Sequence, residues 1–199
     1  MRVPAADPRP DPGALDRDER GASALEFALV LPALVLLVLG VLEYGLVLFL
    51  RVSLDHALGE AARFGITGRT LPGRSREEAV RAVLEERLPA LVDADSLRID
   101  TLVYPDFDSI GRPEPFVDRN GNGTRDPGEP YTDVNGNGRW DDDMGAPGAG
   151  GPDAVVLYRV RTVWRLVTPL APVLAPPDGR LVLESAVAVR NEPFPGDGT

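Results

Sequence analysis

The feature that most constrains this chain is a long apolar run near its N-terminus. The run extends from Ala22 to Leu50, 29 residues rich in Leu and Val whose only charged members are Glu26 and Glu43. A helix crosses the hydrocarbon core of a bilayer with about 20 apolar residues. A buried core helix is the alternative, but it has no need of so long an apolar stretch. We therefore expect residues 22–50 to form a transmembrane helix.

The run differs from a secretory signal peptide in its length and in the residues at its C-terminal end. An ordinary signal peptide has an apolar segment of about 7–15 residues and then a cleavage site of small residues. Here the run ends in Leu48-Phe49-Leu50-Arg51, so we expect the helix to be retained as a single membrane span. Four Arg residues precede it, which favours a cytoplasmic N-terminus and an exported segment 51–199, although Arg51 and Arg63 flank the other end.

The start of the run resembles a prepilin-type processing site. Arg20-Gly21 is followed by Ala22, and Glu26 is the fifth residue after Gly21. The resemblance implies that residues 1–21 are a cytoplasmic leader, that a prepilin peptidase cuts after Gly21, and that Ala22 becomes the new N-terminus. A carboxylate in a membrane is costly unless it is paired, and a neighbouring subunit's N-terminal ammonium is a natural partner for Glu26. The alternative is that Glu26 only marks the membrane boundary.

Two helical segments come after the span. Apolar residues at helical spacing run from Leu54 to Ala62, and Gly65 and Gly68 are expected to end this helix, which is continuous with the span. The sequence Ser75-Arg76-Glu77-Glu78 is a capping box that starts a second helix. That helix has an apolar face from Ala79 to Leu91.

Three alternating segments predict strands at residues 97–104, 156–164 and 181–190, with a Pro-rich loop from residue 169 to residue 177 before the third. Helices that come first and strands that come later favour an α+β fold. We expect residues 51–199 to form an exported, pilin-like α+β domain in which helices pack on a small antiparallel sheet.

The charge of the chain is acidic and unevenly distributed. It has 31 acidic and 21 basic residues, all of the latter Arg, which argues against a nucleic-acid partner because such binding rests on cationic side chains. Residues 101–153 hold 11 acids and four Arg, so most of the net charge of −10 lies in one insert, residues 106–153. The chain has no Cys, so this exported domain must hold its loops by packing or by metal.

The insert contains a calcium-loop motif. Residues 118–129 have the spacing of a 12-residue calcium loop, with Gly123 at position 6, where the loop turns sharply. The candidate ligands are Asp118, Asn120, Asn122, the backbone carbonyl of Thr124, Asp126 and Glu129. Oxygen ligands of this kind suit a hard cation such as Ca²⁺. The alternative is an exposed Asn-Gly-rich turn, which explains the glycines but not the spacing of the oxygens.

The motif repeats 15 residues later. Its candidate ligands are Asp133, Asn135, Asn137, the backbone carbonyl of Arg139, and Asp141. Position 12 is Met144, which has no carboxylate. Asp142 or Asp143 could supply the missing carboxylate with a changed loop geometry. Prolines crowd the first loop, so flanking helices are not expected there. We therefore expect bound Ca²⁺ to act as a structural clip and not as a sensor.

Both ends of the chain resemble the TadE-like family, whose members are minor-pilin-like components of the tight-adherence (Flp) pilus system. The resemblance rests on RGASALEFALVLPALVLLVLGVLEYG (residues 20–45), HALGEAARFGITG (residues 56–68), TPL (residues 168–170) and VAVRNEPF (residues 187–194). It implies a protein of a bacterial inner membrane with a periplasmic C-terminal domain, which assembles an adhesive pilus or enters it. Its partners would be a prepilin peptidase, other pilin-like subunits and the pilus assembly machinery.

The sequence does not predict an enzyme. Its only His is His56, which we expect to be packed or interfacial, and its dense carboxylates lie in the two loops. A second hypothesis is a membrane-anchored calcium-binding module that contacts other envelope proteins and is not incorporated into a pilus. The two hypotheses differ in whether the chain is cut after Gly21.

Overall fold

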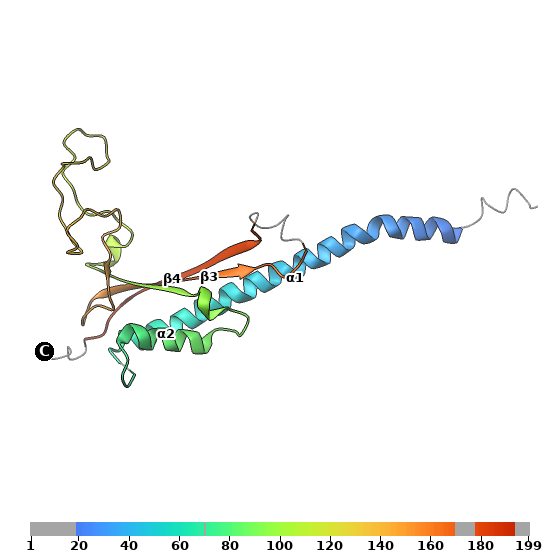
Figure 1. Ribbon diagram of the computed structural model, residues 1–199, viewed down its shortest axis with the longest axis horizontal. Coiled ribbons are helices and arrows are strands. Elements are labelled where there is room, and N and C mark those ends of the chain that lie inside the picture. The colour runs from blue at the N-terminus through green and yellow to red at the C-terminus, as the bar shows by residue number, and fades with distance from the viewer. Residues whose placement is uncertain (1–18, 70, 170–177, 194–199) are drawn as a thin grey trace, which may run out of the picture.

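The computed structural model describes residues 19–69, 71–169 and 178–193, with side chains from Ser23 onward. Its helices are α1 (Glu19–Ile66) and α2 (Arg76–Arg87), with short 3-10 helices η2 (Ala94–Ser96) and η3 (Phe107–Ser109). Its strands are β1 (Arg98–Tyr104), β2 (Ala146–Pro147), β3 (Val155–Arg165) and β4 (Arg180–Arg190). Figure 1 shows α1 running along the sheet and projecting far beyond it at its N-terminal end. A long apolar helix with a small antiparallel sheet confirms the expected α+β class.

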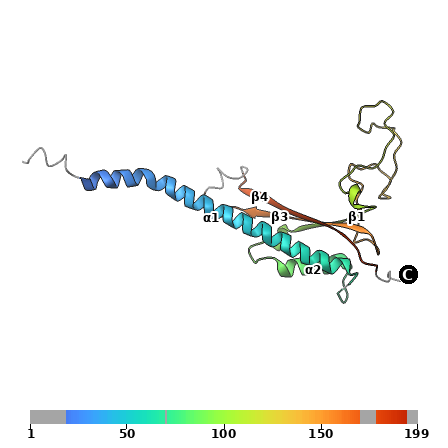
Figure 2. The same cartoon turned by 180° about the vertical axis from the view of Figure 1, so that it is seen from behind.

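α1 is one helix of 48 residues, so the apolar run and the segment after it are continuous, as expected. Pro32 lies inside the helix, and the helix axis bends in its N-terminal third (Figures 1 and 2), as a missing backbone donor and a bulky ring would cause. The helix ends at Ile66. Gly68, with a φ of 66°, comes just after it and donates its N–H to the carbonyl of Gly65 at 3.3 Å. The helix therefore ends between the two glycines expected to end it, with Gly65 as its last residue but one.

The two halves of α1 have different surroundings. Residues 23–42 are exposed apart from the partly covered Leu39 and Gly40, whereas Leu54 and Leu58 are buried in the main core. At about 1.5 Å per residue, residues 23–42 extend over about 30 Å, which is the thickness of a hydrocarbon core. The exposed half of α1 is therefore long and apolar enough to cross a membrane, which fits a single-pass membrane protein.

The strands form one antiparallel sheet in the order β2-β1-β3-β4. The three predicted strands are confirmed, each to within one residue at either end. The Pro-rich loop expected at residues 169–177 lies, beyond Pro169, outside the described residues. β2 has no counterpart among the predicted strands, because two residues show no alternation. It pairs with Leu102 and Val103 of β1 and adds a short outer strand to the sheet.

The main core lies between the helices and one face of the sheet (Figure 2). The face of β3 that carries Tyr158, Val160 and Trp164 points toward the helices, as its alternation predicts. The residues that meet it from α1 repeat at helical spacing and are buried: Leu50, Leu54, Ala57, Leu58, Ala61 and Ala62. Small side chains at Ala57, Ala61 and Ala62 allow α1 to lie close to the sheet and to α2.

α2 begins with the predicted capping box. The Ser75 hydroxyl accepts the N–H of Glu78 at 3.2 Å, and the Glu78 carboxylate accepts the N–H of Ser75 at 2.7 Å. The predicted extension of its apolar face to Leu91 is wrong, because α2 ends at Arg87 and Leu91 is 55% exposed. Pro89 explains this end, since the residue before a proline avoids helical torsion angles, and Leu88 is extended with a ψ of 142°.

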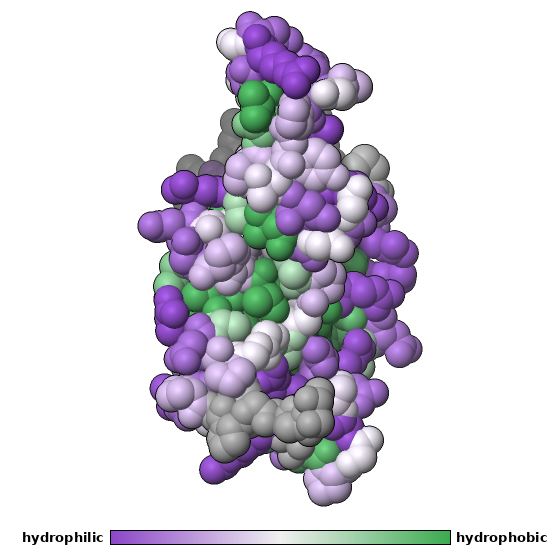
Figure 3. Space-filling model, turned by 90° about the vertical axis from the view of Figure 1, so that its left-hand side faces the viewer, coloured by the Kyte–Doolittle hydropathy of each residue, from purple (hydrophilic) through white to green (hydrophobic). Residues whose placement is uncertain are grey.

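The acidic insert leaves the sheet between β1 and β3 and stands at the end of the molecule opposite the exposed half of α1 (Figure 1). Figure 3 looks at that end, where the projecting insert is largely hydrophilic. Its base is fixed by a second apolar cluster on the sheet, built from Tyr104, Met144, Val155 and Leu157. The insert is thus anchored by packing at its base, while its two motif loops extend into solvent.

Candidate functional site

The processing residues lie at the start of α1. Gly21 and Ala22 have helical backbone, because α1 begins at Glu19, and residues 1–18 of the expected leader lie outside the described residues. Glu26 is exposed on the part of the helix that no other element covers. His56, expected to be packed or interfacial, is exposed on α1.

Glu43, the second acid of the apolar run, has a place that the sequence does not reveal. Its side chain is 1% exposed and faces the end of β3. Its carboxylate accepts the N–H of Thr168 at 2.9 Å, the N–H of Val167 at 3.3 Å and the indole N–H of Trp164 at 3.4 Å. The contact attaches the C-terminal end of β3, and the residues just after it, to α1 where the exposed half of the helix begins. A lone acid inside an apolar run is the signal that such a contact exists, but it does not identify the donors.

The first motif loop folds around Asp118. Its carboxylate accepts three backbone N–H groups, those of Gly121, Asn122 and Gly123, at 2.7, 3.3 and 2.8 Å. The side-chain amides of Asn120 and Asn122 both donate to Oδ2 of Asp126, at 2.7 and 2.9 Å. The Asn122 Oδ1 atom accepts the N–H of Thr124, the residue predicted to offer its carbonyl. The structure therefore brings the predicted residues of positions 1, 3, 5, 7 and 9 into one turn.

Glu129 closes this loop from position 12. Its Oε1 atom accepts the N–H of Arg119 at 2.8 Å, and its Oε2 atom accepts the N–H of Asp126 at 3.0 Å. The residue is only 7% exposed, so its carboxylate is held inside the loop.

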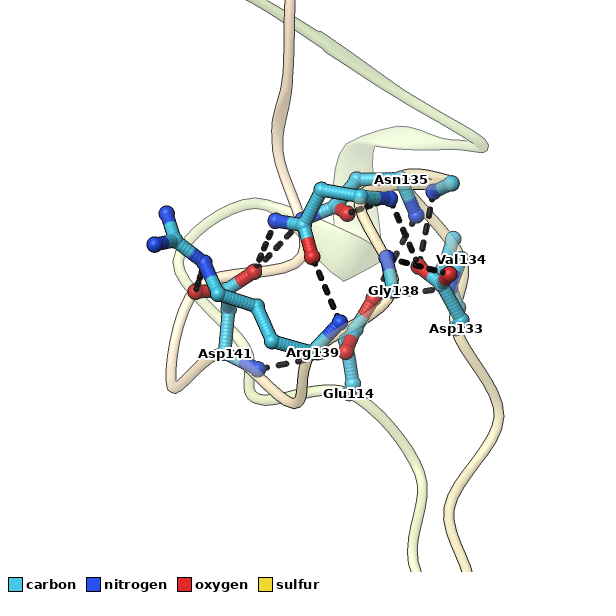
Figure 4. A network of polar contacts seen from close by, with 9 residues as sticks. Glu114, Asp133, Val134, Asn135, Gly138, Arg139 and Asp141 are labelled. Atoms are coloured by element: carbon cyan, nitrogen blue, oxygen red, sulfur yellow. Dashed lines mark hydrogen bonds and ion pairs between the residues drawn. The ribbon is translucent and has the colours of Figure 1, made fainter.

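The second motif loop has the same arrangement around Asp133 (Figure 4). The three backbone N–H groups that bond to the Asp133 carboxylate are those of Gly136, Asn137 and Gly138, at 2.7, 3.1 and 2.8 Å. Asn135 donates its side-chain amide to Oδ2 of Asp141 at 2.9 Å, and Asn137 donates to the same atom. Arg139, predicted to offer its carbonyl, donates its own N–H to Oδ1 of Asn137 at 2.9 Å.

Asp143, one of the two residues named as substitutes for position 12 of the second loop, bonds to a residue outside that loop. Met144 is buried with Tyr104 in the cluster at the base of the insert. Asp143 accepts the hydroxyl of Tyr104 at 2.8 Å, and burial together with this bond raises the pKa of Tyr104 to about 12. Asp142 is exposed. The carboxylate that lies in the second loop belongs to Glu114, whose Oε1 atom accepts the N–H of Val134 at 2.7 Å (Figure 4).

Hydrogen bonds lower the pKa of one acid in each loop. The backbone N–H of Gly123 is the largest of several contacts that hold the pKa of Asp118 below its usual range. The side-chain amides of Asn135 and Asn137 do the same for the pKa of Asp141. Both loops are therefore negatively charged at neutral pH.

The donor chemistry of both loops suits a hard divalent cation. Each offers only carboxylate, amide and backbone carbonyl oxygens, with no nitrogen or sulfur ligand. Among the residues that the structure describes, no three His, Cys, Asp or Glu side chains converge as a metal cluster. The carboxylates of Asp118 and Asp133 accept backbone N–H groups, and those of Asp126 and Asp141 accept asparagine side-chain amides. By residue type and order, the first motif fits Ca²⁺ at every position, and the second fits it except at position 12, where Met144 stands.

These features define a class: an α+β protein whose long N-terminal helix lies half outside and half inside its domain, with an exposed apolar half that fits a single membrane span. Residues 21–63 match the model of a family described as TadE-like protein, which confirms the resemblance over α1 and supports a pilin-like protein associated with the Tad pilus. Comparison with curated proteins found no match, and neither did comparison with solved structures.

Proposed function

We propose that this chain is a membrane-anchored, minor-pilin-like protein that acts in the assembly of a tight-adherence (Flp-type) pilus. The observation that carries the proposal is the TadE-like match over residues 21–63, which covers the exposed helix with Glu26 and continues into the part that packs on the sheet. A helix that is exposed from Ser23 to Leu42 can lie first in lipid and then among the helices of other subunits. In this proposal the domain lies in the periplasm, and a prepilin peptidase removes residues 1–21 after Gly21.

The processing step predicts the N-terminus of the mature protein. When the full chain is expressed in cells with a prepilin peptidase, N-terminal sequencing is expected to begin at Ala22. Gly21→Val is expected to keep the leader, because a branched side chain beside the cut bond obstructs the protease. Gly13→Val, a matched change within the leader, is expected to leave cutting intact. A wild-type protein whose N-terminus lies before Gly21 would contradict the proposed processing.

We further propose that the insert binds Ca²⁺ as a structural clip. Two loops with calcium-motif spacing have their side chains curled around Asp118 and Asp133, and the domain has no disulfide to hold them. An ion bound only by the folded loops stabilises the fold through mass action. Its place at the end of the molecule opposite the exposed half of α1 puts the clip far from the membrane (Figure 1).

Calcium is therefore expected to raise the melting temperature of the full chain in detergent micelles. At about 100 times the Kd, one site adds about 2.7 kcal/mol, which corresponds to roughly 5–10 °C for a domain of this size. Glu129→Gln should remove much of the shift, because it takes away a bidentate ligand, whereas Glu86→Gln, an exposed change on α2, should not. Scanning calorimetry with calcium and with a chelator checks this, and equal melting temperatures would refute the calcium proposal.

A further inference from the structure

The two motif loops belong to a repeat that begins before their first ligand. Glu114-Pro115-Phe116 precedes Asp118 by the same spacing at which Glu129-Pro130-Tyr131 precedes Asp133. The Glu at position 12 of the first loop is therefore also the Glu that opens the second repeat. A third Glu-Pro pair would stand 15 residues further on, where the sequence has Met144-Gly145, so a closing carboxylate for the second loop has to come from elsewhere.

The structure pairs the openings of the two repeats side by side. Phe116 and Tyr131 form an isolated antiparallel β-bridge. Two reciprocal bonds flank it: the N–H groups of Val117 and Thr132 donate to the carbonyls of Pro130 and Pro115, at 2.9 and 2.8 Å. Because these bonds are equivalent, the two repeats are related by a local pseudo-two-fold axis. The same relation that brings Glu129 to the first loop brings Glu114 to the second.

Glu114 and Glu129 make equivalent contacts in the two loops. Each carboxylate accepts the N–H of loop position 2 through Oε1 and the N–H of loop position 9 through Oε2. For Glu129 the donors are Arg119 and Asp126, at 2.8 and 3.0 Å. For Glu114 they are Val134 and Asp141, at 2.7 and 3.1 Å (Figure 4).

The equivalence extends to the side chain at position 8. Arg125 donates from its guanidinium to the backbone carbonyl of Glu129 at 3.1 Å, and Trp140 donates from its indole N–H to the backbone carbonyl of Glu114 at 2.9 Å. Each loop therefore holds its Glu at both the backbone and the carboxylate. Chain order differs between the loops, because Glu129 ends its loop and Glu114 precedes its own by 19 residues.

We infer that Glu114 is the closing carboxylate ligand of the second calcium loop, in the role that Met144 at position 12 cannot fill. The inference rests on the proposed calcium function. Glu114 is 0% exposed, and Asp133 and Asp141 lie in the same loop, where Asp141 pairs with Arg139 at 3.3 Å (Figure 4). With three acids against one Arg, a buried carboxylate is costly unless further positive charge offsets it. A divalent cation in the loop supplies that charge. The insert is then a two-ion unit in which each repeat opens with the Glu that closes the other repeat's loop.

Calcium stoichiometry tests the inference. The full chain in detergent micelles, freed of metal with a chelator, is titrated with Ca²⁺ by isothermal titration calorimetry. The wild type is expected to bind two ions per chain. Glu114→Gln is expected to leave one of them at wild-type affinity and to weaken the other at least tenfold. The reason is that even the loss of an outer-shell partner of a metal ligand commonly weakens metal binding by that factor. Glu129→Gln should do the same to the first loop, and the double variant should weaken both.

Asp142→Asn is the matched control, because Asp142 is the exposed acid closest to position 12 in sequence. It should keep both ions at wild-type affinity. Glu114→Asp, which keeps the charge but shortens the side chain, covers the case in which the Gln variant does not fold, as judged by circular dichroism. It should also weaken one ion at least tenfold.

Two tight ions in the folded Glu114 variants, or the loss of an ion in Asp142→Asn, would overturn the assignment while leaving calcium binding in place. No calcium binding by the wild type would instead refute the proposed calcium function and the assignment with it.

Discussion

Replacing Glu43 by Ala is expected to lower the free energy of unfolding of the domain by about 2–4 kcal/mol. The substitution removes the acceptor of three N–H groups, which belong to Trp164, Val167 and Thr168. A buried donor that loses its acceptor costs about 1–3 kcal/mol, and the partly buried backbone groups recover some of this from water. The domain should therefore detach from α1 more easily at the point where the exposed half of the helix begins.

Reversible urea unfolding of the full chain in detergent micelles measures this change. Glu60→Ala is a suitable control, because Glu60 lies on the same helix and is exposed. Its effect should stay within about 0.5 kcal/mol. If the Glu43 and Glu60 variants unfold at the same urea concentration, the Glu43 contact does not stabilise the domain.

Replacing Gly65 by Ala is expected to destabilise the domain by about 1–3 kcal/mol, although Ala is ordinarily the better helix former. Gly65 lies inside α1, directly against the ring of Tyr158. A methyl group at this position would overlap with the Tyr158 hydroxyl and lie 3.2 Å from Cγ2 of Val80. Tyr158 is 0% exposed, so its ring has no room to withdraw.

A matched substitution in the same helix separates the overlap from helix propensity. Gly59→Ala meets no atom within 4 Å and should stabilise the chain by up to about 1 kcal/mol. Tyr158→Phe removes the hydroxyl, which has no hydrogen-bond partner among the described residues, and should restore part of the stability of Gly65→Ala. Thermal unfolding of the three variants and the double variant provides the comparison. A Gly65→Ala protein at least as stable as Gly59→Ala would contradict the close packing.

Local patterns predict most of the secondary structure. The apolar run, the capping box at Ser75 and the alternation of β3 each act over a few neighbouring residues, so periodicity and capping rules identify them. The turns of both motif loops are likewise local, because Asp118 and Asp133 bond to N–H groups three to five residues ahead of them. The end of α2 is the exception, since its apolar spacing continues to Leu91 while Pro89 stops the helix.

The tertiary structure decided what depends on residues far apart in the chain. Glu43 meets donors more than 120 residues away, and no periodicity in an apolar run indicates which backbone N–H groups they are. Gly65 resembles a helix stop in the sequence, yet its role follows from Tyr158 of β3, which lies against it. Such pairs form only when the sheet packs on α1.

The acidic insert shows both contributions together. Its sequence by itself determined two loops of oxygen-bearing side chains, because motif spacing is a property of consecutive residues. It left the second loop without a closing acid, because a linear motif seeks that acid at position 12, where Met144 stands. The bridge between Phe116 and Tyr131 turns the repeats toward each other and carries Glu114 into the loop that comes after it in the chain. Only folding could reveal that exchange, since it joins two segments by backbone pairing and not by spacing.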